Sequence, residues 1–301
     1  MSKILITGGS GLVGKHLCIK LQEKGYEVAI LSRSKNELSK IPTYTWDVDK
    51  NEIDKNAINS ADFIIHLAGV NISERKWTSK QKKLILNSRI QSGNLIFNHI
   101  DKNNNTLKAF ITASAVGFYG AVTSDKIFDE TTAAAKDFLG KTCAQWEQVA
   151  DKFTSIGIRT VKIRTGIVLT KKGGALSKIA KPIKLGLGAA IGSGKQYLPW
   201  IHIDDLCNIY LKAIEDENMV GSYNAVAPEK ISNKEFSHTL AINLKKPFWL
   251  PNIPAIILRL IFGEMSVILL NGSRISSAKI ETSGYKFKFT NLESALNHLK
   301  L

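Results

Sequence analysis

The N-terminal stretch, residues 1–23, constrains the fold of this chain most. Ile4–Ile6 form a short apolar run, long enough for a buried parallel strand, and a glycine-rich turn follows it immediately. Beyond the turn, Val13, Leu17 and Leu21 recur at helical spacing. The sequence therefore predicts a strand, a tight turn and a helix in direct succession.

The glycines of this turn, Gly8, Gly11 and Gly14, have GxxGxxG spacing. One glycine tolerates the tight turn, a second lets backbone approach phosphates, and a third lets the helix pack against the strand. The helix N-terminus adds free N–H groups and the positive end of the helix dipole. We expect a dinucleotide pyrophosphate here; a glycine-rich structural turn is the alternative. The residues expected to contact the cofactor are Thr7, Gly8, Gly9, Ser10, Gly11, Leu12, Val13 and Gly14.

Length and composition favour one large domain with an appendage, because 301 residues at 44% hydrophobic content can bury a sizeable core. No uncharged apolar run reaches about 18 residues, so we expect no transmembrane helix. The first strand begins at once, so we expect no signal peptide. Cys18, Cys143 and Cys207 are odd in number, widely spaced and form no CxxC pair. They indicate reduced thiols in the cytoplasm and no metal site.

The formal net charge of +15 could attract nucleic acid, an acidic membrane or an anionic substrate. The lysines are scattered, however, and no nucleic-acid-binding motif accompanies them. We therefore expect a solvated basic surface and partners that include neither nucleic acid nor membrane. A phosphorylated cofactor would use part of this charge.

Strands and helices alternate along the first half of the chain. Strands are predicted at 27–31, 44–46, 62–67, 107–112, 159–163 and 222–225, and amphipathic helices at 80–99 and 138–154. This order predicts an α/β, Rossmann-type doubly wound parallel sheet, with ligands beyond the carboxyl ends of its strands. The apolar face expected for the first of these helices comprises Leu84, Ile85, Ile90, Leu95 and Ile96.

The regular alternation of predicted strands and helices ends at about Gly173. Gly173-Gly174 and the glycine-rich stretch 186–194 suggest loops over a cleft, and residues 251–301 read as mostly helical. We expect a nucleotide-binding domain over 1–225. A smaller, mostly helical C-terminal region on the substrate side is expected over 250–301.

Residues at the predicted strand ends suggest which cofactor is bound. Ser32 and Arg33 stand where a carboxylate would accept from the ribose hydroxyls of NAD, and an arginine would instead meet the 2′-phosphate of NADP. We expect NADP rather than NAD; a solvated loop charge is the alternative for Arg33. Asp47 could accept from an adenine amino group, cap a helix or close a turn. Ala68 and Gly69, which follow Leu67, are small and let the backbone lie against the cofactor.

Four phrases together resemble the extended short-chain dehydrogenase/reductases, and more narrowly their sugar-nucleotide-epimerase-like branch. These phrases are Thr7–Gly14, His66–Gly69, Arg164–Gly166 and Trp200–Asp205. Similar phrases of that branch are Arg75–Thr78, Asn87–Ile90 and Ser114–Gly120. Its C-terminal domain of uncharacterised function resembles Gly263–Ser266, Leu269–Arg274 and Gly284–Phe287. The resemblance covers essentially the whole chain and implies a Rossmann-type fold and bound NADP or NAD, with Asn87 and Arg164 among the cofactor contacts.

The superfamily uses a Tyr-x-x-x-Lys pair with a serine for proton transfer. The corresponding helix here has no tyrosine followed by a lysine four residues later: Phe138 lacks an acidic hydroxyl, and Thr142 and Cys143 supply no cation. Lys141 is one residue off, which turns it about 100° away from that face. The site should therefore bind the nucleotide but lack the usual proton relay.

Three groups could replace the relay. Ser114 could hold a substrate oxygen, Tyr119 could donate a proton or simply pack, and Glu147 could act chemically or serve as a structural carboxylate. His202 could titrate near neutral pH or lie buried and hydrogen-bonded. Asp204 or Asp205 could act in catalysis or cap the helix that follows.

We hypothesise an NADP-dependent oxidoreductase or epimerase-like enzyme. Its substrate would be a small carbonyl or hydroxyl compound, or a nucleotide-linked sugar. The alternative is a non-catalytic protein in which NADP occupancy controls a partner surface. The helices at 80–99 and 138–154 are the faces on which we expect a homodimer to form.

Overall fold

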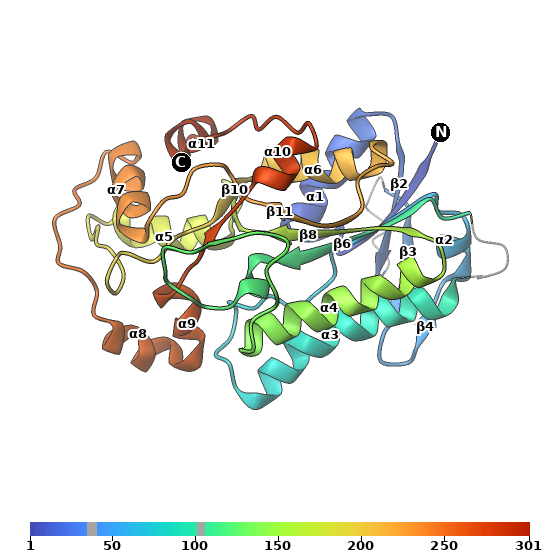
Figure 1. Cartoon of the computed structure of the whole chain (residues 1–301), viewed down its shortest axis with the longest axis horizontal. Coiled ribbons are helices and arrows are strands. Elements are labelled where there is room, and N and C mark those ends of the chain that lie inside the picture. The colour runs from blue at the N-terminus through green and yellow to red at the C-terminus, as the bar shows by residue number, and fades with distance from the viewer. Residues whose placement is uncertain (35–40, 101–105) are drawn as a thin grey trace.

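A computed structural model describes residues 1–34, 41–100 and 106–301. Within these residues eight strands form the central sheet, in the order β11-β8-β6-β5-β1-β2-β3-β4 (Figure 1). The strands are β1 (Lys3–Thr7), β2 (Glu27–Ser32), β3 (Thr43–Asp47), β4 (Glu52–Ile53), β5 (Phe63–His66), β6 (Ala109–Ala115), β8 (Arg159–Thr165) and β11 (Gly221–Ala225). Every pairing is parallel except that of β3 with β4. The predicted doubly wound sheet is confirmed.

Helices cover both faces of this sheet. α1 (Leu12–Glu23) and α6 (Ile203–Glu215) pack on one face, and α3 (Ser79–His99) and α4 (Phe138–Ser155) lie side by side on the other (Figure 1). The short α2 (Lys55–Asn59) adds to the second face. Side chains of β1 alternate between the two cores, because successive residues of a strand point to opposite faces. Its continuous apolar run is therefore buried on both sides.

The buried face of α3 is only partly the predicted one. Ile85, Leu95 and Ile96 are buried, and Ile90 is half-buried, but Leu84 is 48% exposed and its prediction is wrong. The helix packs against α4 through small residues, and a Cβ built on Gly93 would lie 2.8 Å from Val149 Cγ1. This close approach decides which side of the helix faces inward.

Beyond β8 the chain forms a smaller lobe. β9 (Ile167–Leu169) pairs in parallel with β10 (Trp200–His202), and α5 (Gly174–Lys184), α7 (Asn233–Asn243) and α11 (Leu292–Leu299) pack with them. Gly173 lies in the loop that was predicted, but the prediction for Gly174 was wrong, since α5 begins there and buries Leu176, Ala180 and Ile183. The stretch 186–194 is irregular, as predicted.

The C-terminal segment is mostly helical, as expected. It contains α8 (Ala255–Phe262), η2 (Gly263–Ser266), α9 (Val267–Leu270) and α10 (Ala278–Thr282) before α11, and its short β12 (Arg274–Ile275) pairs with β7 (Ile127–Phe128). Asp205 is fully buried and accepts from the Tyr285 hydroxyl, at 2.7 Å, and from two backbone N–H groups, of Lys288 at 2.8 Å and of Phe289 at 3.0 Å. This carboxylate fastens the segment to α6.

Neither aspartate caps α6. His202 is the capping residue, because its Nδ1 accepts from the backbone N–H of Asp204 at 3.0 Å. Asp204 instead bonds His16 on α1, with 2.7 Å between carboxylate Oδ1 and Nε2. The capping role expected for Asp204 or Asp205 was wrong, since both carboxylates are engaged with other elements.

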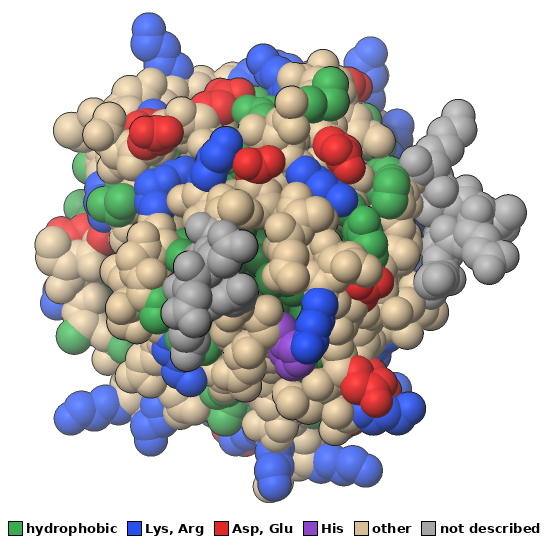
Figure 2. All heavy atoms as spheres, turned by 90° about the vertical axis from the view of Figure 1, so that its right-hand side faces the viewer, with side chains coloured by type: hydrophobic (Ala, Val, Ile, Leu, Met, Phe, Trp, Pro, Cys, Tyr) green, Lys and Arg blue, Asp and Glu red, His purple; other side chains and the backbone are tan. Residues whose placement is uncertain are grey.

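The molecular surface shows mixed charges. On the face in Figure 2, Lys and Arg side chains are spread out and interleaved with Asp and Glu, and do not form one continuous cluster. Among the residues that the structure describes, no helix has the length and apolarity needed to cross a membrane.

Candidate active site

The glycine turn between β1 and α1 leaves no room for side chains. Gly8 has φ +70°, and a Cβ there would lie 2.9 Å from the Leu67 carbonyl carbon. A Cβ on Gly14 would lie only 2.3 Å from Gly8 O and 2.6 Å from Gly9 Cα. The turn is tight because Gly11 N–H donates to Gly8 O at 2.9 Å.

The start of α1 is open. Its N-cap, Gly11, has no side chain to accept from the first turn, and no described residue supplies a capping side chain. Ser10 and Gly11 are exposed. Unbonded N–H groups and the positive helix end are therefore exposed at the carboxyl edge of the sheet, which is a suitable site for an anion.

Thr7 acts on the inner side of this turn. Its hydroxyl is bonded to His66 Nδ1 at 2.7 Å and accepts from Ala68 N–H at 3.2 Å. His66 in turn lies 3.2 Å from the Ser92 hydroxyl. Burial lowers the pKa of His66 to about 4, so the ring is neutral at pH 7. Thr7 thereby joins the ends of β1 and β5.

The other predicted cofactor contacts lie at the same edge of the sheet. Leu67, Ala68 and Gly69 follow β5 beside Gly8, and Ser32 and Arg33 end β2, with Arg33 exposed. Asn87 is half-buried on α3. Asp47 closes a turn by accepting from the backbone N–H groups of residues 49 and 50, at 3.0 and 3.1 Å. The structure thus gives Asp47 the turn role that was the alternative.

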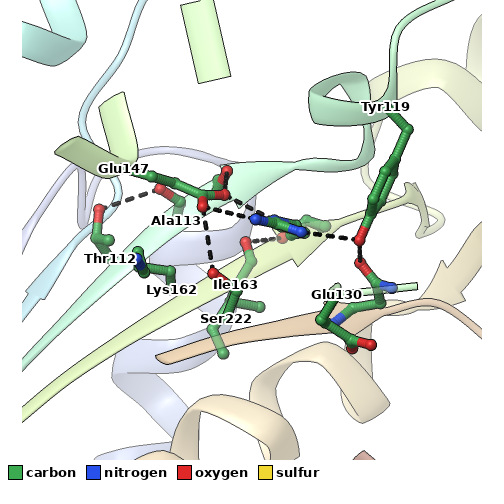
Figure 3. A network of polar contacts seen from close by, with 12 residues as sticks. Thr112, Ala113, Tyr119, Glu130, Glu147, Lys162, Ile163 and Ser222 are labelled. Carbon is green, nitrogen blue, oxygen red and sulfur yellow. Dashed lines mark hydrogen bonds and ion pairs between the residues drawn. The ribbon is translucent and has the colours of Figure 1, made fainter. Parts of the chain in front are cut away.

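A row of polar side chains crosses the carboxyl ends of three strands. Ser114 on β6 is in register with Arg164 on β8, and Arg164 is in register with Asn224 on β11. Residues in register on parallel strands present their side chains to the same face. α4 covers this face and places Glu147 over the row (Figure 3).

These residues form one buried network. Ser114 Oγ donates to Glu147 Oε1 at 2.7 Å, and Arg164 binds both carboxylate oxygens, through Nε at 2.8 Å and Nη2 at 2.9 Å. Arg164 Nη1 donates to the Tyr119 hydroxyl at 2.9 Å, which donates to Asn224 Oδ1 at 2.7 Å. All five residues are at most 5% exposed. The three candidate catalytic residues therefore meet in one cluster.

The network shifts the pKa of two members. Burial alone would lower the pKa of the Arg164 guanidinium, but its bonds to Glu147 and Tyr119 outweigh burial and raise it. Burial raises the pKa of Tyr119 to about 12, although Arg164 and Asn224 oppose the shift. Arg164, predicted as a cofactor contact, is engaged in an ion pair, and the Tyr119 proton is held by Asn224.

The helix that would carry the superfamily pair provides no substitute of the same kind. Thr142 is buried and donates to Phe138 O at 2.7 Å, and Lys141 is exposed, as its position on the helix predicted. Burial raises the pKa of the Cys143 thiol to about 12. All three cysteines lie in the described part of the chain, buried and unpaired, as their spacing predicted.

Sequence reasoning missed part of the network. Asn224 receives the Tyr119 hydroxyl, Ser222 donates to Glu147 Oε2 at 3.2 Å, and Glu130 accepts from Asn224 N–H at 2.7 Å. The signal was polar residues at alternate positions of an otherwise buried strand, Ser222–Ala225. Their partners depend on the strand order and could not be read from it.

His202, Asp204 and His298 lie close enough to suggest a metal site. Because His202 Nδ1 accepts from the Asp204 backbone, its Nε2 carries the proton and points to His298 Nδ1, 3.3 Å away. A metal would need the lone pair that this tautomer lacks. Burial lowers the pKa of His202 to about 4, so this histidine is the buried, hydrogen-bonded one of the two alternatives.

Comparison with known proteins agrees with this fold. The chain is 36% identical over 297 residues to the epimerase family protein YfhF of Bacillus subtilis, covering 98% of this chain and 97% of that protein. The crystal structure of human epimerase family protein SDR39U1 with NADPH superposes with a TM-score of 0.87 at 30% identity, covering 99% of both chains. A nucleoside-diphosphate sugar epimerase from Corynebacterium glutamicum has a TM-score of 0.81 at 30% identity, covering 99% of this chain and 58% of that one.

Two family descriptions divide most of the sequence between them. Residues 253–299 match a domain of unknown function, DUF1731, as the C-terminal phrases implied. Residues 4–226 match the NAD dependent epimerase/dehydratase family, to which this chain belongs.

Proposed function

We propose that this protein binds NADP and transfers hydride to or from a small carbonyl or hydroxyl compound. The observation that carries the proposal is the glycine turn at the open N-terminus of α1, with the Ser114–Glu147 pair at the same edge of the sheet. The similarity to human SDR39U1, whose structure contains NADPH, supports it.

The residues present fit a dinucleotide. Gly8, Gly9 and Gly14 keep the turn free of side chains, so the pyrophosphate would rest on backbone N–H groups at the start of α1. Arg33, exposed at the end of β2, would pair with the 2′-phosphate of NADP. Leu67–Gly69 would line the path toward the nicotinamide. When bound, the nicotinamide supplies or accepts the hydride.

Ser114 and Glu147 would move the accompanying proton. Ser114 Oγ lies at the end of β6 and already donates to the carboxylate at 2.7 Å. A substrate oxygen at Ser114 would exchange its proton with the hydroxyl, and Glu147 would accept or return it. Arg164 holds both carboxylate oxygens, so it orients Glu147 and stabilises its charge. Tyr119 orients Arg164 and does not itself transfer the proton.

Titration of the purified chain with NADPH and with NADH, followed by tryptophan fluorescence, tests the cofactor. We expect NADPH to bind at least about tenfold more tightly, and Arg33→Ala to remove this preference. Gly14→Ala should abolish binding of both, because its Cβ overlaps the Gly8 carbonyl. Gly25→Ala, at the other end of α1, is the control for destabilisation alone: no atom lies within 4 Å of its Cβ, but its φ of +84° strains the backbone, so stability should fall and affinity should not change. Equal binding to Gly14→Ala and wild type would refute the turn assignment.

Turnover of NADPH with a panel of carbonyl compounds tests the chemistry. Ser114→Ala and Glu147→Gln should each lower kcat by about 10²-fold or more, with NADPH affinity retained. Tight NADPH binding with no turnover across the panel would instead favour a non-catalytic NADP-binding protein.

A further inference from the structure

Arg89 is a largely enclosed cation that has no carboxylate counter-ion among the described residues. Its side chain on α3 is half-buried, and Nη1 and Nη2 donate to the backbone carbonyls of Ile85 and Val70 at 2.8 and 3.1 Å. Across residues 1–34, 41–100 and 106–301, no carboxylate oxygen lies within 4.0 Å of its guanidinium. Arg164, a buried arginine at the same edge of the sheet, has Glu147 as its counter-ion. A cation removed from water without a partner is costly, so Arg89 requires another explanation.

Trp146 provides an unpaired hydrogen-bond donor at the same place. The Arg89 guanidinium carbon lies 5.0 Å from the centre of the Trp146 ring. This ring is 7% exposed, and its indole N–H is buried without an acceptor in the described part of the chain. Buried indole N–H groups normally find a partner. At this place in the described structure, Arg89 thus lacks a counter-ion, and the neighbouring Trp146 N–H lacks an acceptor.

The position of Arg89 is that of a ligand contact. A Cβ built on Gly69, which is exposed in the loop after β5, would lie 3.2 Å from the Arg89 guanidinium carbon. The Arg89 guanidinium also lies over the ring of Trp146 on α4, the helix whose Cys143 Sγ lies 3.7 Å from a Cβ built on Gly117 just after β6. Arg89 therefore lies between the loop after β5 and the helix that covers the end of β6. The glycine turn belongs to β1, on the opposite side of β5.

We propose that Arg89 and the Trp146 indole N–H bind an anionic oxygen group of the substrate, a carboxylate or a phosphate. The substrate would then be an anionic carbonyl or hydroxyl compound, an inference that rests on the proposed hydride transfer. The planar guanidinium suits such a group because it can donate two parallel hydrogen bonds. The proposed pyrophosphate site lies at α1, one strand away. A bound dinucleotide would therefore leave the charge of Arg89 without a counter-ion.

Binding of acetate and inorganic phosphate to the full chain, with acetamide as the uncharged analogue, tests the site by calorimetry with and without saturating NADPH. We expect at least one anion to bind at least about tenfold more tightly than acetamide. Arg89→Gln should weaken that anion at least about tenfold, and Arg89→Lys less, while NADPH affinity changes little. Trp146→Phe keeps an aromatic ring but removes the pyrrole half of the indole together with its N–H, so it should weaken the anion about threefold.

Arg159→Gln is the matched control. Arg159 is also half-buried and donates to the backbone carbonyls of Ala213 and Met219. It lies at the amino end of β8, however, and the candidate site lies at the carboxyl end. Its loss should affect stability and leave anion binding unchanged. Unchanged anion affinity in both Arg89→Gln and Trp146→Phe would overturn the proposal, as would equal affinity for acetamide. A loss of NADPH affinity in Arg89→Gln, as large as the loss of anion affinity, would assign the cation to the cofactor instead. Failure of wild type to bind NADPH, with anion binding intact, would refute only the proposed function.

Discussion

At the scale of single residues, the buried ion pair of Glu147 and Arg164 organises the candidate site. Each group compensates the other in surroundings that exclude water, and each also holds a hydroxyl, of Ser114 or Tyr119. A charged pair of this kind contributes little net stability against apolar residues, yet removal of one member is costly because it leaves the other unpaired. The stability of the fold and the proposed chemistry of the site therefore both depend on the Glu147 side chain.

Glu147→Gln should lower the free energy of unfolding by about 3 kcal/mol, because the Arg164 charge stays buried without its partner. Asp151→Asn is the control on the same helix. Asp151 is 54% exposed in its pair with Lys162, so its loss should cost about 1 kcal/mol or less. Urea unfolding of both variants measures the difference, and equal losses would contradict the burial of the network.

His66 and His202 make stability depend on pH. Burial lowers the pKa of each to about 4, below the value of about 6.5 expected in the unfolded chain. The unfolded state therefore binds more protons, so their contribution is complete above pH 6.5 and is lost as pH falls toward 4. The free energy of unfolding should drop by up to about 1.4 kcal/mol per pH unit for each histidine.

His202→Asn retains a capping side chain for α6 and removes one titrating ring. Urea unfolding between pH 7 and pH 4 should show a shallower loss of stability for this variant than for wild type. Parallel profiles of the two proteins would mean that His202 is not the neutral buried group described here.

At the scale of secondary-structure elements, the accuracy of prediction from sequence followed the range of the interactions. The β1–turn–α1 unit was predictable because spacing along the chain sets it: apolar strand, three glycines, helix. The burial predicted for Leu84 and the loop predicted at Gly174 were wrong. Packing of α3 against α4 sets which α3 side chains are buried, and packing within the smaller lobe makes Gly174 the first residue of α5. His202 is the N-cap of α6, since the carboxylates of both neighbouring aspartates bind other elements.

The same distinction applies to the site. Ser114, Tyr119 and Glu147 could be proposed singly, because each stands beside a predicted strand end or on a predicted helix. Their connection through Arg164 depends on the order β6-β8-β11, which brings together residues up to about 100 positions apart. No pattern along the chain records which strands become neighbours.

At the scale of the whole molecule, Asp205 joins the C-terminal segment to α6, which packs on the central sheet. Asp205→Asn would offer one acceptor oxygen where three donors now converge, so at least one donor would face an amide N–H group. We expect a loss of about 2–3 kcal/mol and faster proteolysis between residues 271 and 291.

Limited proteolysis and hydrogen exchange of residues 285–299 measure this loosening. Asp216→Asn, at the other end of α6, is the control, because the Asp216 carboxylate accepts from Lys212 and from the Asn218 backbone, both outside the C-terminal segment. Equal protease resistance of the Asp205 variant and wild type would show that other contacts hold the segment.

The shared row of Ser114, Arg164 and Asn224 has a genetic consequence. Side chains alternate along a strand, so a slip of β11 by one residue would exchange Asn224 for Tyr223 or Ala225, both of which now pack in the apolar core on the other face. A single-codon deletion in the connection from α6 to β11 would favour such a slip. The length of that connection should therefore tolerate less change than its amino-acid composition.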